Sequence, residues 1–294
     1  MWLGQLLNGL VNGAMYSLVA LGFTLIIGVL DKLNFTHPEV FMLGGFVGLL
    51  SFQYLPVPWA LLVAFVVGGG MGLFTEWIAF RRFKSSESKI TAALSSMALG
   101  LVVTDLVQKY WGTEPVSLPS LPAWMAENVE IAGVQFQYLN FFILLVTLML
   151  MVAVHLFIHK TRSGRQIRAV AESPLNASLL GIDVKRVSQM VFFISSGLAA
   201  EAGLLLSLRS SSANSEIGLL FGLKALAIMA IGGLGNMKGA VWGGLLIGVL
   251  EASLFVWGLG RWVEMTVWVM VILTMIVKPG GLFSASTKPE ESRA

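Results

Sequence analysis

The sequence predicts an all-α polytopic membrane protein, a single transmembrane domain over residues 1–294 with about eight or nine membrane segments, some of them broken or re-entrant. Of its residues, 56% are hydrophobic and only 12% are charged, whereas a soluble domain has about 25% charged residues. The apolar residues form long continuous runs, which is typical of membrane-spanning helices. A membrane β-barrel would instead show short alternating segments.

The runs divide the chain into successive elements, which we expect at 6–30, 40–54, 59–80, 90–111, 138–158, 187–208, 219–231, 240–257 and 262–277. The first run has no basic leader and no small-residue cleavage site, so we expect a span rather than a removable signal. The run at 219–231 leaves two possibilities open: it crosses the membrane, or it stops at the glycine cluster that follows.

The run at 40–54 is short for a span, so we expect it to begin inside the membrane at a break. Asn34, His37 and Glu39 lie at this break and are candidates for lining a pathway or gate. The alternative is a capped turn, with Thr36 as N-cap and Pro38 in the first turn of a helix. The sequence favours neither interpretation.

Glycines gather again after the run at 219–231, where Gly232, Gly233 and Gly235 predict a second helix break near a substrate pathway. Small residues also recur at four-residue spacing, which is typical of closely packed membrane helices. Such pairs include Gly9/Gly13, Gly44/Gly48, Gly68/Gly72 and Gly244/Gly248.

The distribution of Lys and Arg predicts the orientation. The segments 81–89 and 160–186 are basic and the polar tail 284–294 carries Lys288 and Arg293, whereas 112–137 is acidic and contains neither Lys nor Arg. Because basic loops stay in the cytoplasm, we expect the N-terminus outside and the C-terminus inside.

The cytoplasmic loop at 160–186 has the pattern of two short helices. Ser163 is the expected cap of a helix at 164–172, and Ser173 followed by Pro174 predicts the start of another at 174–180. Gly181 is a typical residue after a helix end.

Leu179 and Leu180 would be exposed on this loop unless something covers them. The pattern slightly favours docking into a groove of a partner protein. The alternative is a helix lying on anionic lipid.

Motifs for chemistry are absent from this sequence. It has no P-loop, no H-E-x-x-H, no G-x-S-x-G, no cysteine, and three scattered histidines, so we expect neither an enzyme nor a metal site. A small net charge of +3 gives no indication of a nucleic-acid partner.

Among the charged residues within spans, Asp105 and Lys109 are spaced to pair. Glu201 is either a proton relay or the partner of Lys224 or of a neighbouring helix.

Several long blocks in order resemble the permeases of branched-chain (hydrophobic) amino-acid ABC transporters. GRQIRAVAESPLNASLLGIDVKRV is similar to the family's cytoplasmic coupling segment. NGAMYSLVALGFTLIIGVLDKLNFTHPEVFMLGGF, GGLGNMKGAVWGGLLIGVLE and VKPGGLF resemble its N-terminal, late glycine-rich and C-terminal blocks. By this resemblance, the residues that couple to the ATPase are Arg165, Arg168, Glu172, Pro174, Ala177, Leu179, Leu180 and Gly181.

The resemblance implies a multi-pass subunit of a bacterial inner-membrane importer. Its partners would be a second homologous permease subunit, two cytoplasmic ATPases and an external solute-binding protein. This chain would hold no cofactor, because ATP and Mg²⁺ would bind in the ATPases. The implied solute is a branched-chain or other hydrophobic amino acid, with urea, a short amide or another small solute as alternatives. A stand-alone secondary transporter is the rival class.

Overall fold

The computed structural model describes residues 2–83, 89–117, 122–131 and 134–283. Within them, seven helices are long and apolar enough to cross a membrane, and two more, α2 and α10, are apolar but shorter. This confirms an all-α polytopic membrane protein with the expected number of segments. The nine apolar helices are α1 (Trp2–Leu30), α2 (His37–Phe52), α3 (Val57–Thr75), α4 (Lys89–Trp111), α6 (Tyr138–Lys160), α9 (Val184–Ser210), α10 (Ile217–Gly232), α11 (Met237–Val256) and α12 (Val263–Val277). A π-helical turn, Glu76–Phe80, prolongs α3, and a 3-10 turn, Gly260–Trp262, precedes α12.

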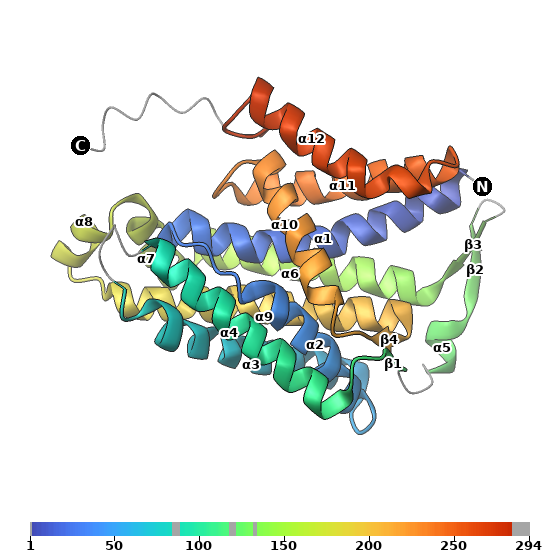
Figure 1. The fold of residues 1–294 in the computed structure, drawn as a ribbon, viewed down its shortest axis with the longest axis horizontal. Helices are drawn as coiled ribbons and strands as arrows, with labels where there is room; N and C mark the ends of the chain where they lie inside the picture. Colours follow the sequence, from blue (N-terminus) through green and yellow to red (C-terminus); the bar gives the residue numbers. More distant parts are fainter. Residues whose placement is uncertain (1, 84–88, 118–121, 132–133, 284–294) are drawn as a thin grey trace.

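Helices α1 and α9 form the centre of the bundle. Their most apolar windows are 78% and 89% buried, against 28% for α4 and 17% for the segment that contains α12. Figure 1 shows α1, α6, α9 and α11 roughly along the long axis of the molecule, with α10 crossing them steeply. The outer helices therefore have most of their apolar surface free for lipid or for other subunits.

Glycines allow the central helices to approach closely, as the four-residue spacing predicts. A Cβ added to Gly13 of α1 would lie 2.9 Å from the carbonyl oxygen of Gly244 in α11. A Cβ on Gly44 of α2 would overlap the backbone of Ala200, and one on Gly203 would overlap the carbonyl of Phe41. These contacts leave no room for a side chain, so backbone packing replaces side-chain packing here.

The short helices α2 and α10 begin inside the bundle, which confirms that some segments are broken. His37, the first residue of α2, places Nε2 3.4 Å from the carbonyl oxygen of Val19. Val19 lies about 16 Å along the helix from the last residue of α1, at 1.5 Å per residue. The start of α10 lies beside the same place, because Gly218 and Gly222 contact Pro38.

Short strands and helices occupy the two ends of the bundle. At one end, β1 (Val116–Ser117) pairs with β4 (Ser212–Ala213), and β2 (Asn128–Ile131) pairs with β3 (Val134–Gln137), both antiparallel, with α5 (Ala123–Ala126) nearby. The sequence of 112–137 indicated only an acidic connection there. At the other end lie α7 (Arg162–Glu172) and α8 (Pro174–Leu179) (Figure 1).

We call these the hairpin end and the α8 end. Their separation agrees with the predicted placement of 112–137 and 160–186 on opposite sides of the membrane. Which side is cytoplasmic stays a prediction. The predicted tail, 284–294, lies outside the described residues, as do residues 84–88 of the predicted basic loop.

Candidate coupling loop and translocation face

Helix α7 starts from a threonine cap. The Thr161 hydroxyl oxygen accepts a hydrogen bond from the Gly164 amide at 2.9 Å, and the helix begins at Arg162. The expected cap at Ser163 is therefore wrong, because α6 ends early enough for the preceding hydroxyl to take that position. Ile167 and Val170 are buried and fix α7 against the bundle.

Helix α8 follows the predicted pattern closely. The Ser173 hydroxyl oxygen accepts from the Asn176 amide at 3.2 Å, and Pro174 opens the helix. The helix ends at Leu179, one residue earlier than expected, and Gly181 adopts a φ of 81° after it. The structure thus confirms both predicted boundaries of α8 to within one residue.

The outer surface of α8 is apolar. Leu175, Leu179 and Leu180 are 70%, 78% and 80% exposed, while Ala177 is buried on the opposite side. We call these three leucines the leucine patch. Of the residues predicted to couple to an ATPase, all except Ala177 are exposed: Arg165, Arg168, Glu172, Pro174, Leu179, Leu180 and Gly181. Their role in coupling stays a prediction.

The structure brings Asn34, His37 and Glu39 together at the inner start of α2. Asn34 Oδ1 accepts from the Thr36 amide at 3.1 Å, and Glu39 Oε2 accepts from the Thr104 hydroxyl at 2.7 Å. Thr36 is the N-cap residue of α2 and Pro38 lies in the first turn, as the capped-turn alternative predicts, but the Thr36 hydroxyl donates to the carbonyl of Ser96 at 2.7 Å and makes no cap hydrogen bond. Asn34 Nδ2 and His37 Nδ1 are buried and have no hydrogen-bond partner among the described residues. A gate at this junction stays a prediction.

The glycine cluster forms a tight turn between α10 and α11, so the predicted helix break is confirmed. Gly233 and Gly235 have φ values of 106° and 77°, where a glycine avoids the strain of a side chain. The turn lies against Gly28 near the end of α1, and Gly235 borders a small cavity shared with Arg168 of α7. Gly232, Gly233 and Gly235 therefore lie toward the α8 end, and the structure does not bring them together with His37. A pathway role for them stays a prediction.

A charge network that the sequence did not predict connects four helices. Lys224 Nζ lies 2.9 Å from Glu251 Oε1 and 2.7 Å from Glu264 Oε1, and the Tyr16 hydroxyl donates to Glu251 Oε2 at 2.8 Å. The expected pairing of Lys224 with Glu201 is therefore wrong. Glu201 is buried, and its Oε2 has no hydrogen-bond partner in the described part of the chain. The predicted pair of Lys109 with Asp105 is confirmed at 3.0 Å.

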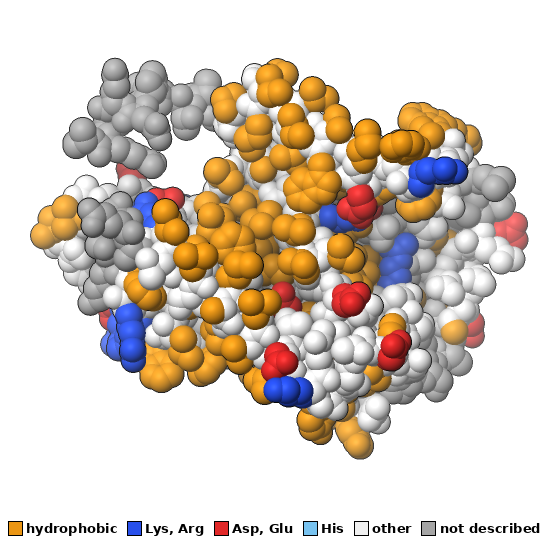
Figure 2. Space-filling model, in the orientation of Figure 1, with side chains coloured by type: hydrophobic (Ala, Val, Ile, Leu, Met, Phe, Trp, Pro, Cys, Tyr) orange, Lys and Arg blue, Asp and Glu red, His pale blue; other side chains and the backbone are white. Residues whose placement is uncertain are grey.

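Polar and charged side chains reach the surface beside this network. Glu264 has 60% of its side chain exposed, and Arg209 donates to Asn12 Oδ1 at 2.6 Å and Asn8 Oδ1 at 3.2 Å. Figure 2 shows acidic and basic side chains set among hydrophobic ones on the face that carries α10 and α12. Charged groups within a bilayer are stable only beside water or partner groups. This surface, which we call the α10–α12 face, is therefore the candidate translocation face.

Comparison with known proteins agrees with this architecture. The family of branched-chain amino acid transport system permease components matches residues 5–277. The high-affinity branched-chain amino acid transport system permease protein LivH of Salmonella typhimurium is 31% identical, with 96% of this chain and 95% of the relative covered. BraD of Pseudomonas aeruginosa, named as the same kind of permease, is also 31% identical, with the same coverage.

A probable branched-chain amino acid transport permease of Methanocaldococcus jannaschii is 26% identical over 92% of this chain and 89% of its own length. No solved structure matches. The matches and the apolar helices together confirm a multi-pass permease subunit of the inner membrane. The chain belongs to the family of branched-chain amino acid ABC transporter permeases.

Proposed function

We propose that this chain imports branched-chain or other hydrophobic amino acids as half of a translocation pathway. The relatives at 31% identity are named for branched-chain amino acids, which supports this substrate class. The second half would be a homologous permease subunit seated on the α10–α12 face, where charged groups at membrane depth require water or a partner. An external solute-binding protein would deliver the solute.

The energy source would be two ATPases that dock on α7 and α8. The observation that carries this part is the leucine patch, whose members are 70–80% exposed on a helix capped at both ends. Exposed leucines on a rigid short helix fit an apolar groove. ATP and Mg²⁺ would bind in the ATPases, since this sequence has no P-loop.

The test replaces Leu179 with Asp and uses Asn176→Asp as the matched control. Both positions are exposed on α8 and both variants add one negative charge, but only the first removes an apolar contact. Burial of one leucine contributes about 1.5–3 kcal/mol, so we expect Leu179→Asp to weaken ATPase binding about ten- to a hundredfold.

Co-purification of the ATPases with the permease and ATP-driven leucine uptake by proteoliposomes would both be measured. Normal uptake by Leu179→Asp would refute docking through the leucine patch. Uptake driven by an ion gradient with the permease alone would refute the importer itself and favour a secondary transporter. ATP-driven uptake of urea or a short amide, but not of leucine, would refute the substrate.

A further inference from the structure

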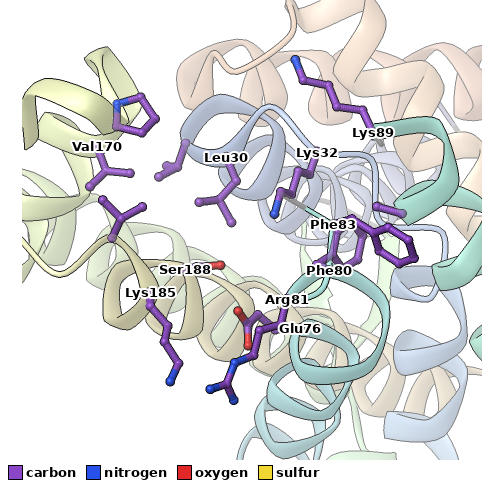
Figure 3. A pocket seen from close by; sticks show the side chains of 14 residues that line it. Leu30, Lys32, Glu76, Phe80, Arg81, Phe83, Lys89, Val170, Lys185 and Ser188 are labelled. Carbon is purple, nitrogen blue, oxygen red and sulfur yellow. The ribbon is translucent and has the colours of Figure 1, made fainter. Parts of the chain in front are cut away.

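A cavity of 670 Å³ lies at the α8 end, between residues 160–186, which we call the coupling loop, and the ends of α1 and α3. Its size is within the usual range of small-molecule sites, about 300–1,000 Å³. Figure 3 shows the side chains around it, which come from segments far apart in the sequence. Apolar groups such as Val29, Leu30, Phe80 and Val170 form much of the wall.

One buried carboxylate lies in this wall without a full set of partners. Glu76 occupies the π-helical turn after α3, and the residue is only 4% exposed. Its Oε2 has no hydrogen-bond partner among the described residues. An incompletely paired buried carboxylate is unfavourable, so a ligand that donates a hydrogen bond to it would be stabilised.

Cationic side chains lie near the Glu76 carboxylate without forming an ion pair with it among the described residues. Lys32, Arg81 and Lys185 all line the cavity and interact electrostatically with Glu76. None of the three forms an ion pair with it within 4.0 Å in the described part of the chain. Lys32 Nζ lies 5.5 Å from the ring centre of Phe80, and burial lowers the pKa of this lysine while Glu76 opposes the change.

The arrangement selects among ligand charges. A simple anion would satisfy the cations but would be repelled by Glu76, and a simple cation would be repelled by Lys32, Arg81 and Lys185. We propose that the cavity binds a zwitterion with an apolar body, its ammonium group on Glu76 and its anionic group on Lys32, with Arg81 and Lys185 nearby. The Ser188 hydroxyl, which faces the same hollow in Figure 3, adds a neutral polar contact.

Two sources supply this chemistry on the side that the charge distribution predicts to be cytoplasmic. One is a free hydrophobic α-amino acid, and this source rests on the proposed function. The other is the headgroup of an ethanolamine phospholipid, whose ammonium and phosphate have the same pair of charges.

A ligand bound in this cavity would connect the coupling loop to the transmembrane helices. Pro174, the first residue of α8, and Lys185, in the first turn of α9, line the same cavity as Glu76. A ligand held between them and α3 would brace α8 against the bundle. Since α8 carries the leucine patch, such a ligand would influence how an ATPase docks.

The first experiment measures binding of radiolabelled leucine to the complete transporter in nanodiscs of phosphatidylglycerol, without ATP or solute-binding protein. We expect saturable binding that weakens at least tenfold in Glu76→Gln and in Lys32→Gln. Glu130→Gln, an exposed carboxylate on β2 at the hairpin end, is the matched control and should bind normally. N-acetyl-leucine and leucinamide each lack one charge and should not compete.

The second experiment adds phosphatidylethanolamine to the nanodiscs. Displacement of leucine, or retention of this lipid that depends on Glu76, identifies the lipid as the occupant. If leucine binding is unchanged when phosphatidylethanolamine is added, the amino acid is identified as the occupant.

The inference is overturned if neither ligand shows binding dependent on Glu76, or if N-acetyl-leucine competes as well as leucine. Leucine uptake by proteoliposomes containing the solute-binding protein is measured in parallel. A transporter that imports leucine but lacks this binding would keep the proposed function and lose only the cavity site.

Discussion

Replacing Lys224 with Met should destabilise the permease more than any other single charge removal in the network. The side chains of Lys224 and Glu251 are only 12% and 5% exposed. Without the lysine, Glu251 keeps only the Tyr16 hydroxyl as a partner among the described residues, and removing one partner of a buried ion pair costs about 3–5 kcal/mol. Glu251→Gln leaves Lys224 paired with Glu264 at 2.7 Å, so we expect a loss of only about 1 kcal/mol.

The double variant Lys224→Met/Glu251→Gln separates charge from packing. It removes the stranded carboxylate, so it should recover most of the stability that Lys224→Met loses, a coupling of about 2–3 kcal/mol. Lys109→Met is the control, because Lys109 and Asp105 form an i,i+4 pair with side chains 73% and 63% exposed. Its effect should stay below about 1 kcal/mol.

The free energy of unfolding would be measured by denaturant titration of the four variants in the same detergent. Equal stability of Lys224→Met and Lys109→Met would refute the reasoning. So would a double variant no more stable than Lys224→Met alone, because the loss would then come from packing of the lysine chain.

Two further predictions concern packing and capping. Gly203→Ala should destabilise the protein by about 1–3 kcal/mol, because the new Cβ would overlap the carbonyl of Phe41; Gly70→Ala, with nothing within 4 Å of its Cβ, should be neutral or stabilising in the same thermal unfolding assay. Equal effects of Gly203→Ala and Gly70→Ala on thermal unfolding would argue against the close contact between α9 and α2. Ser173→Ala should remove about 1 kcal/mol from α8 by deleting its cap, seen as faster amide hydrogen exchange at Asn176; unchanged exchange would show that the hydroxyl does not hold the helix.

Features set by local chemistry were predicted from the sequence. The start of α8 follows from Ser173 and Pro174, and its end follows from Gly181, because capping depends on residues within one turn. The predicted cap of α7, Ser163, lies two residues after the observed cap, Thr161. The sequence did not distinguish them, since both side chains carry a hydroxyl group. The choice between them depends on where α6 ends, which tertiary packing decides.

Features set by distant contacts were not predictable in this way. Lys224 is 27 residues from Glu251, and Tyr16 is 235 residues from it. No spacing rule connects such positions, and each charge in an apolar run looks isolated until the helices are placed. The same reason explains the cavity around Glu76, whose wall combines the ends of α1 and α3 with residues of α7, α8 and α9.

The contact between α1 and α11 has a consequence for biosynthesis. Helix α1 leaves the ribosome well before α11, yet its buried glycine face is covered by α11, where Gly248 lies against Gly9 and Gly13. The Ser17 hydroxyl likewise donates to the carbonyl of Val241 at 2.8 Å, on a helix made more than 200 residues later. The nascent chain must therefore hold α1 in the bilayer, incompletely packed, until α11 is inserted. A transcript truncated before α11 would give a membrane-inserted chain in which α1 never acquires this partner, and such a chain is a natural target for membrane quality-control proteases.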